Sequence, residues 1–292
     1  MTTNLFNDFN PISSKQWKQK IQFELKGADY NETLVWNSPE DIQVKPFYHK
    51  DEFTKSFPVI TKATAFRICQ NIFVFDIEKS IERALDTLNR GADSLRFTIE
   101  NESIDITNLL EKLPLDNVTV YFNLGFISID FVQKIDAFAK KNNTRIFCNL
   151  DPIGQLAKDG NWFVTKEKNN FETLNLLSKQ TKSVSLLSIN VALYQNAGAN
   201  MVQQIAYILG QANDYFNRIE TINQPIVFEV AVGTNYFFEI AKLRTLRLLF
   251  NLIAKEYNHT LDCNIIVSPT KRNKTLYDYN VNLLRTTTEC MS

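Results

Sequence analysis

The sequence predicts an α/β fold around a parallel β-sheet, because short apolar runs alternate with longer helical patterns along most of the chain. Seven runs, of five to eight residues each, are apolar on both faces, as strands that are covered on each side must be. A helical pattern follows each run, and such β-then-α units in series give parallel strands joined by right-handed crossovers. Only 8 Gly and 8 Pro favour long regular elements over small turn-rich β modules.

The expected elements follow one another in chain order. The strands are predicted at Phe66–Gln70, Ser94–Ile99, Val118–Leu124, Arg145–Leu150, Val184–Val191, Ile226–Val232 and Asn264–Ser268. The helices are predicted at Ile77–Asn89, closed by Gly91, and at Ile106–Leu113, Ile129–Lys141, Asn170–Lys179, Met201–Ile219, Tyr236–Tyr257 and Val281–Ser292.

A closed barrel is preferred to an open, doubly wound sheet. An open dinucleotide-binding fold would carry a glycine-rich turn after its first strand, and neither G-x-G-x-x-G nor G-x-x-x-x-G-K occurs in the chain. A (β/α) TIM-type barrel needs eight strands, whereas residues 65–292 supply seven and end within a helical pattern. The predicted domain is therefore an incomplete barrel, truncated before its eighth strand.

Residues 1–64 differ in character and are expected to form an N-terminal arm. A helix is predicted over Lys15–Lys26, where Gly27 stops it, and extended segments follow. Trp36, Phe47 and Tyr48 lie on these segments, and aromatic side chains strung along an extended arm usually bury against another surface. They are candidates for contact with a partner chain or with this chain's own barrel.

Composition narrows the function classes. Thirty-two basic and thirty-two acidic residues give a net charge of zero, which disfavours nucleic acid or an acidic membrane as a partner. The N-terminus carries no secretory signal, and polar residues interrupt the uncharged stretch 183–213 before it could span a membrane. Four singly scattered cysteines fit free thiols in a reducing cytoplasm, and no spacing of cysteine and histidine predicts a metal site.

The candidate site of a parallel barrel is the mouth formed by the carboxyl ends of its strands. The residues placed there are Glu100, Asn123, Asn149, Asp151, Asn190, Glu229, Ser268 and Thr270, of which Asn149, Asp151, Asn190 and Glu229 are the candidates kept. Asp151 and Glu229 are a possible carboxylate pair for acid–base work. The alternative is that Glu229 pairs with a lysine or arginine of the barrel.

Several short segments resemble segments of the methylmalonyl-CoA mutase family, and they occur in the same order as in that family over the whole chain. They are Leu25-Lys26-Gly27-Ala28-Asp29-Tyr30, Leu34-Val35-Trp36, Ile42-Gln43-Val44-Lys45-Pro46-Phe47-Tyr48, Leu88-Asn89-Arg90-Gly91-Ala92-Asp93-Ser94-Leu95, Asp151-Pro152-Ile153-Gly154, Ala197-Gly198-Ala199, Glu239-Ile240-Ala241-Lys242-Leu243-Arg244 and Asn282-Leu283-Leu284-Arg285-Thr286-Thr287. The resemblance implies a barrel that threads a CoA thioester through its axis, beside a separate domain that holds adenosylcobalamin. Such enzymes isomerise methylmalonyl-CoA to succinyl-CoA in propionate metabolism, and in the two-chain version a related small subunit binds no cofactor.

Four departures from the family's pattern imply the small subunit. Ala192 and Leu193 stand where the family has a tyrosine and its acid–base histidine, and leucine supplies no polar donor to a thioester carbonyl. Asn149 replaces a glutamine, Asp159 replaces the arginine that pairs with the substrate carboxylate, and Cys69 replaces a further arginine. No catalytic, cofactor-binding or metal-binding residue is therefore assigned to this chain.

The resemblance also implies where the cofactor belongs. The family's cobalamin domain supplies a lower axial ligand from an Asp-x-His-x-x-Gly motif, but Phe47 and Tyr257 stand two places before His49 and His259. Adenosylcobalamin is therefore expected on a partner, the catalytic large subunit, in a heterodimer. Two other readings stay open: an active acyl-CoA mutase barrel acting on a different CoA ester, and a barrel enzyme outside this family.

Overall fold

The computed structural model describes residues 9–53, 66–261 and 263–291, and the chain divides into two units. The first unit is Met1–Val59 and the second is Ile60–Ser292. The boundary predicted between residues 64 and 65 lies outside the described residues.

The first unit is an arm of short elements held by local caps. Helix α1 (Ser14–Glu24) begins with a capping box, in which Ser13 and Gln16 each accept the other's backbone N–H. The chain leaves this helix through Lys26 and Gly27, both at positive φ. Further short elements follow: α2 (Tyr30–Leu34), an antiparallel pair of β1 (Trp36–Asn37) and β2 (Gln43–Val44), and the 3-10 turn η1 (Lys50–Glu52). The predicted helix is confirmed, whereas α2 and the hairpin were not predicted.

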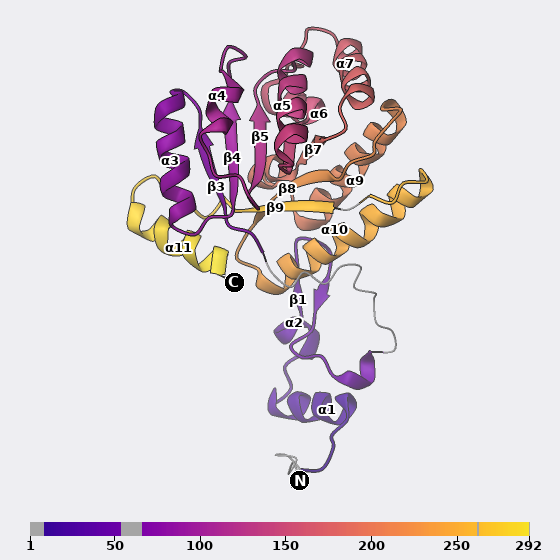
Figure 1. Cartoon of the computed structure of the whole chain (residues 1–292). Helices are drawn as coiled ribbons and strands as arrows, with labels where there is room; N and C mark the ends of the chain where they lie inside the picture. Colours follow the sequence, from indigo (N-terminus) through magenta and orange to yellow (C-terminus); the bar gives the residue numbers. More distant parts are fainter. Residues whose placement is uncertain (1–8, 54–65, 262, 292) are drawn as a thin grey trace, which may run out of the picture. The chain divides into compact units, whose positions relative to one another are not determined.

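The second unit is built on one parallel sheet whose strands follow chain order. Its strands are β3 (Cys69–Phe73), β4 (Ser94–Ile99), β5 (Thr119–Leu124), β6 (Ile146–Leu150), β7 (Val184–Asn190), β8 (Ile226–Val232) and β9 (Cys263–Pro269). Because neighbours in the sheet are neighbours in the chain, no switch point of a doubly wound fold occurs. Strand direction changes steadily from β3 to β9 in Figure 1, as in a sheet that curls into a half-barrel. The incomplete TIM-type barrel is confirmed.

Helices connect the strands and cover the outer face of the sheet (Figure 1). They are α3 (Ile77–Asn89), α4 (Ile106–Glu111), α5 (Ile129–Asn142), α6 (Pro152–Asp159), α7 (Glu167–Gln180), α8 (Val191–Asn196), α9 (Met201–Arg218), α10 (Tyr236–Glu256) and α11 (Tyr279–Met291). The predicted helices are all present, and α6 and α8 are additional. Val191, predicted to end a strand, instead begins α8, because the Asn190 side chain accepts the Leu193 N–H and caps that helix.

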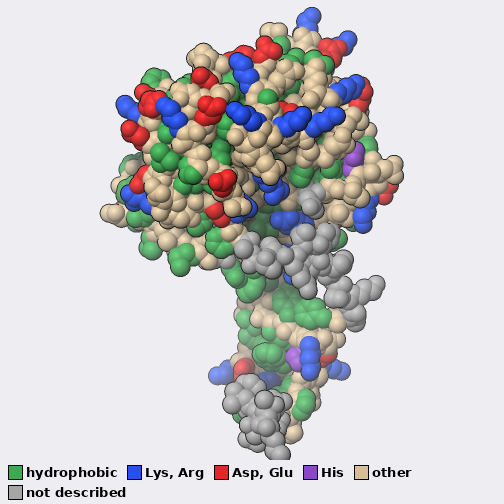
Figure 2. Space-filling model, in the orientation of Figure 1, with side chains coloured by type: hydrophobic (Ala, Val, Ile, Leu, Met, Phe, Trp, Pro, Cys, Tyr) green, Lys and Arg blue, Asp and Glu red, His purple; other side chains and the backbone are tan. Residues whose placement is uncertain are grey.

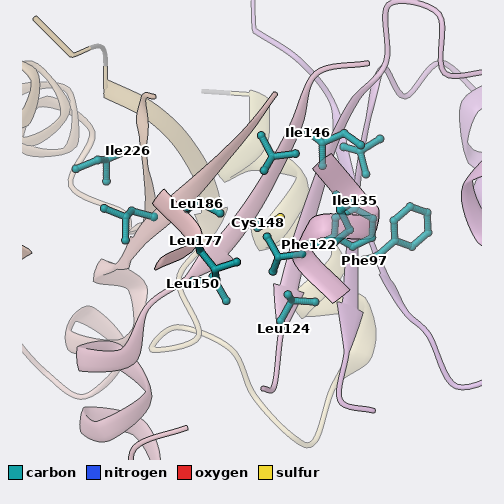
Figure 3. Close-up of a cluster of buried hydrophobic side chains, with 14 of the residues drawn as sticks. Phe97, Phe122, Leu124, Ile135, Ile146, Cys148, Leu150, Leu177, Leu186 and Ile226 are labelled. Atoms are coloured by element: carbon teal, nitrogen blue, oxygen red, sulfur yellow. The ribbon is translucent and has the colours of Figure 1, made fainter. Parts of the chain in front are cut away.

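The main core lies between the outer face of the sheet and the helices. Figure 3 shows how Phe97, Phe122 and Cys148 from the strands meet Ile135 of α5 and Leu177 of α7. All five are at most 1% exposed, so burial of this apolar surface is the main force that holds the helices on the sheet.

The first strand begins at Cys69, not at the predicted Phe66. Phe66 and Ile68 are 81% and 55% exposed, and the Ile68 N–H donates to the Asp93 carboxylate at 2.7 Å. The apolar run therefore starts in a connecting segment tied to the loop before β4. Within the described residues, β3 and β9 each pair with one neighbour only and not with each other.

The surface of the second unit mixes both signs of charge (Figure 2), in keeping with the zero net charge of the chain. Among the described residues, no helix is both long enough and apolar enough to cross a membrane.

Candidate functional site inside the half-barrel

Alternation along each strand divides the sheet into an outer, helix-covered face and an inner face. Phe97, Phe122 and Phe228 point outward into the main core, so their strand neighbours point inward. A second, smaller apolar cluster of Tyr121, Phe147, Val227 and Ile266, with Cys69 packed against it, confirms this division. Five polar residues at inward positions are joined to one another by hydrogen bonds, and we call them the inner polar layer: Asn71, Arg96, Asn123, Asn149 and Glu229.

The small apolar cluster fills part of the barrel interior with aromatic rings. Tyr121 and Phe147 stack with ring centroids 4.9 Å apart and planes 15° from parallel. The Arg145 guanidinium lies 5.1 Å from the Phe147 centroid, and Asn264 donates to the Tyr121 hydroxyl at 3.1 Å. Burial raises the pKa of Tyr121, so this hydroxyl stays neutral at physiological pH.

The inner polar layer is held together by an ion pair between distant strands. Arg96 of β4 donates from Nη1 to Glu229 Oε2 of β8 at 2.8 Å, and both side chains are only 12% exposed. The same guanidinium donates from Nε to Asn71 Oδ1 of β3 at 2.5 Å. The alternative considered for Glu229, pairing with a basic residue of the barrel, is therefore the one that the structure shows.

Asn149 extends this layer toward the middle strands. Its Nδ2 donates to Glu229 Oε1 at 3.1 Å and to Asn123 Oδ1 at 2.8 Å. Two acceptors around Nδ2 fix the amide orientation, which leaves Asn149 Oδ1 buried and without a hydrogen-bond partner in the described part of the chain. An unsatisfied buried acceptor costs free energy, so this oxygen has capacity for a donor that the described residues do not supply.

Asp151 belongs to a different network, which lies between the carboxyl end of β6 and the helices. Its Oδ1 accepts from Gly154 N–H at 2.8 Å and from the Tyr215 hydroxyl and Gln211 Nε2, each at 2.5 Å. Its Oδ2 accepts from Asn190 N–H at 2.8 Å. Burial raises the pKa of Asp151 to about 6, although these hydrogen bonds oppose the rise. A carboxylate with four donors caps α6 and ties it to α9, so the structure does not place Asp151 and Glu229 in one acid–base pair.

The remaining mouth candidates serve other contacts. Asn190 caps α8, and Thr270 donates to Gln195 Oε1 at 2.9 Å. Glu100 is exposed and Ser268 is half-buried, and no hydrogen bond between described residues joins either to the inner polar layer. The structure therefore brings together Asn123, Asn149 and Glu229 from the predicted set, but not Asp151 or Asn190.

Sequence reasoning missed Arg96 and Asn71, the two members that complete the layer. The signal lies in strand β4, where Ser94, Arg96 and Thr98 alternate with buried Leu95, Phe97 and Ile99. Strict alternation is typical of a strand with one apolar face, so the inner face of this strand is polar. The expectation of strands apolar on both faces is wrong there.

A second buried polar cluster joins the helices near the end of β8. Lys242, 2% exposed, donates to Ala231 O at 2.7 Å and to Gln204 Oε1 at 3.1 Å, and its Nζ lies 2.6 Å from Glu239 Oε2. Glu239 Oε1 in turn accepts from Gly233 N–H at 2.8 Å. Burial lowers the pKa of Lys242. Every charge in this cluster has a partner, so it fixes α9 and α10 on β8.

Both histidines contact neighbouring side chains. His49 Nδ1 faces the Asp51 carboxylate at 2.9 Å, and the His259 ring stacks on Phe216 with centroids 5.3 Å apart. Across the described ranges, His, Cys, Asp and Glu side chains form no group of three or more that could hold a metal ion. Burial raises the pKa of Cys69 to about 11, which keeps this inner thiol protonated and poorly nucleophilic.

The aromatic candidates of the arm differ in exposure. Trp36 and Tyr48 are 48% and 52% exposed. Phe47 is half-buried and stacks on Trp17 of α1, with ring centroids 4.5 Å apart. In Figure 2, apolar side chains reach the surface of the described arm.

Comparisons with known proteins place these features in one family. A family model described as methylmalonyl-CoA mutase matches residues 99–292. The chain is 30% identical to the methylmalonyl-CoA mutase small subunit of Porphyromonas gingivalis, over 99% of this chain and 52% of that protein. It is 32% identical to a methylmalonyl-CoA mutase of Cereibacter sphaeroides, over 82% of this chain and 42% of that protein. It is 23% identical to the small subunit of Propionibacterium freudenreichii subsp. shermanii, over 97% of this chain and 51% of that protein. The chain thus spans about half the length of the curated relatives it matches.

Proposed function

Because the chain belongs to the methylmalonyl-CoA mutase family, we propose that it is a small, non-catalytic subunit of that isomerase. In this proposal it docks on the catalytic large subunit in the cytoplasm and stabilises it. The holoenzyme isomerises methylmalonyl-CoA to succinyl-CoA, and this chain alone has no activity.

One observation carries the proposal: the inward side chains of the sheet bind one another. Arg96 and Glu229 neutralise each other at 2.8 Å, and Asn149 is occupied by Glu229 and Asn123. A CoA thioester that entered the interior would have to break the ion pair and separate the Tyr121–Phe147 stack. Breaking a buried pair is costly, because it leaves uncompensated charges. The interior is therefore suited to holding strands together, and not to receiving a substrate.

The cofactor belongs to the partner in this proposal. Adenosylcobalamin would supply the radical chemistry of the family when it is bound, and a histidine side chain of the protein would hold it. The residues described here do not fit that role, because His49 is engaged with Asp51 and His259 is stacked on Phe216. We therefore derive no catalytic step through this chain.

Docking is assigned to the arm. Trp36 and Tyr48 expose about half of their surfaces on an arm with little core of its own, and exposed aromatic residues are enriched at protein interfaces. We therefore assign residues 1–64 to partner contact and residues 65–292 to the barrel, with Trp36, Phe47 and Tyr48 as contact residues.

The central experiment measures isomerisation with and without the partner. The purified chain, its large subunit and an equimolar mixture would each be assayed with adenosylcobalamin and methylmalonyl-CoA. We expect turnover only where the large subunit is present, with higher thermal stability of that subunit in the mixture. Turnover by this chain alone would contradict the proposal.

The docking assignment has its own test. Trp36→Ala and Tyr48→Ala should each weaken the complex about tenfold in a pull-down titration or in analytical ultracentrifugation. Tyr277→Ala is the matched control, because Tyr277 is 97% exposed but lies outside the arm. Equal affinity of all variants would exclude the arm as the contact surface.

A second function also needs a test, because Asn149 Oδ1 is buried and has no hydrogen-bond partner among the described residues. A free acceptor inside the half-barrel is compatible with an active acyl-CoA mutase that acts on a different CoA ester through repositioned polar groups. This alternative predicts that a panel of branched acyl-CoA thioesters contains one that the chain isomerises with adenosylcobalamin alone. Asn149→Ala would abolish that activity, whereas the non-catalytic proposal predicts no turnover with any thioester.

A further inference from the structure

A pocket lies away from the inner polar layer, on the helix side of the sheet at the start of β7. Its volume is about 350 Å³, within the size range of small-molecule sites. The lining comes from the end of α7, from the first residues of β7 and from the loop that leads into β8. The lining includes Leu174, Lys179, Lys182, Val184, Ile219 and Ile222.

The deep wall of this pocket is apolar. Leu174, Val184, Ile219 and Ile222 are each at most 5% exposed, and they come from three separate segments of the chain. An apolar concavity of this kind is favourable for the aliphatic part of a ligand, because the ligand's surface leaves water when it binds.

Hydrogen bonds hold the walls in place. Asn175 of α7 accepts from Glu220 N–H and donates to Arg218 O, each at 2.8 Å, so the loop after α9 is fastened to α7. Asp136 Oδ1 accepts three consecutive backbone N–H groups, those of Lys182, Ser183 and Val184. Gln224 Nε2 donates to Lys182 O at 3.1 Å and closes the remaining side. The pocket is therefore preformed, and a ligand has little ordering entropy to offset.

The rim carries one lysine whose ammonium group is in no ion pair within the described part of the chain. Lys179 and Lys182 are the charged residues of the lining, and Lys179 Nζ pairs with Glu220 Oε2 at 2.7 Å. Among the described residues, no acidic side chain pairs with Lys182, which is exposed. A lysine in the lining of an apolar concavity matches a ligand with an anionic head and an aliphatic body.

We propose that this pocket binds a medium-chain aliphatic carboxylate, with the carboxylate at Lys182 and the chain against Leu174, Ile219 and Ile222. The site lies at the amino-terminal end of β7, whereas the mouth of a parallel barrel lies at the carboxyl ends of its strands. The proposal is independent of the proposed function, because it involves neither the inner polar layer nor the arm.

The test is isothermal titration of the full chain with sodium decanoate, below the concentration at which decanoate self-associates. We expect saturable binding at one site, and decylammonium chloride of equal chain length should bind at least fivefold more weakly. Lys182→Gln should weaken decanoate binding about fivefold. Lys79→Gln is the matched control, because Lys79 is an exposed lysine on α3 and should leave the affinity unchanged.

Filling the pocket supplies a second variant. Ile222→Phe puts a phenyl ring in place of the smaller isoleucine side chain in the apolar wall, so it should abolish decanoate binding. Circular dichroism checks that the variant keeps its secondary structure. Equal binding of the anionic and cationic ligands, unchanged affinity in Lys182→Gln, or unchanged affinity in a folded Ile222→Phe would each overturn the proposal. So would binding that appears only when decanoate self-associates.

Discussion

Arg96 and Glu229 show how a single pair of side chains organises the interior of the half-barrel. They come from β4 and β8, which are not neighbours in the sheet, yet their charged groups lie 2.8 Å apart. Each side chain is mostly buried, so each charge depends on the other for its solvation. The pair therefore fixes the curvature of the sheet, because flattening the sheet would separate the two charges.

Removing one charge of this pair should destabilise the protein more than removing both. Glu229→Gln leaves the Arg96 guanidinium buried without a counter-charge, and we expect the free energy of unfolding to fall by about 3 kcal/mol. Arg96→Met combined with Glu229→Leu should cost less than Arg96→Met alone or Glu229→Leu alone. Urea unfolding of the wild type, the single variants and the double variant measures this coupling. Additive effects would mean that the two charges do not stabilise each other.

Asp151 should make stability depend on pH. Burial raises its pKa to about 6 from the ordinary 3.8, so the folded chain holds this proton to a higher pH than the unfolded chain. The contribution of the group to stability is therefore full below about pH 4 and is lost as pH rises through about 6. The loss is about 3 kcal/mol.

The Asp151→Asn variant tests this pH dependence. It also loses acceptor capacity at the cap of α6, so it should be less stable than the wild type at every pH. Urea unfolding at pH 4, 5, 6 and 7 should show a difference between the two proteins that is largest at pH 4 and narrows toward pH 7. Asp130→Asn, at the exposed start of α5, gives the baseline. A difference that widens toward pH 7 would contradict the assignment.

The hydrogen-bond and ion-pair partners of the site residues were harder to predict from the sequence than their positions along the strands. The sequence placed Asn149 near the carboxyl end of its strand, which is where it lies, whereas Glu229, also expected at a strand end, lies in the middle of β8. It could not show that Arg96 meets Glu229, since the two are 133 residues apart and only the curl of the sheet joins them. Nor could it show that Asp151 turns toward Tyr215 of α9, because that contact depends on how two helices pack.

At the scale of elements, the two glycines Gly91 and Gly210 should respond in opposite ways to the same substitution. Gly91 follows α3 at φ +104, which side chains with a Cβ rarely adopt, whereas Gly210 lies inside α9 with open space around it. Gly91→Ala should destabilise the chain by about 1 kcal/mol, and Gly210→Ala should stabilise it by about 0.5–1 kcal/mol. Thermal unfolding of both variants against the wild type checks the signs. Equal shifts would show that local backbone conformation does not limit stability at these two positions.

The sequence predicted helices and strands correctly where the hydrophobic pattern is long, and it missed short helices whose start depends on a capping side chain. Helix α3 and strands β4 and β8 have the predicted bounds, because each is a sustained pattern with a clear end. Helices α6 and α8 are short, and side chains of Asp151 and Asn190 start them directly after their strands. A run of six to eight residues carries too little periodicity to show a helix.

The sheet of the second unit contains two kinds of strand, interior strands and edge strands. Strands β4 to β8 pair on both sides, whereas β3 and β9 pair on one side only within the described residues. The burial pattern follows: β6 is buried at every position, while Phe73 of β3 and Val267 of β9 are 59% and 47% exposed. Protection from solvent should therefore fall from the middle of the sheet toward both edges.

Hydrogen–deuterium exchange of the full chain tests this gradient. Backbone amides of β5 and β6 have strand neighbours on both sides and a helix layer over their outer face, so they should exchange only when the unit unfolds as a whole. Amides of β3 and β9 should exchange at least tenfold faster, through local opening at the edges. Peptides that cover residues 69–73, 119–124, 146–150 and 263–269 report each strand separately. Uniform protection across all four would mean that β3 and β9 are not free edges, and that the sheet of the isolated chain is closed.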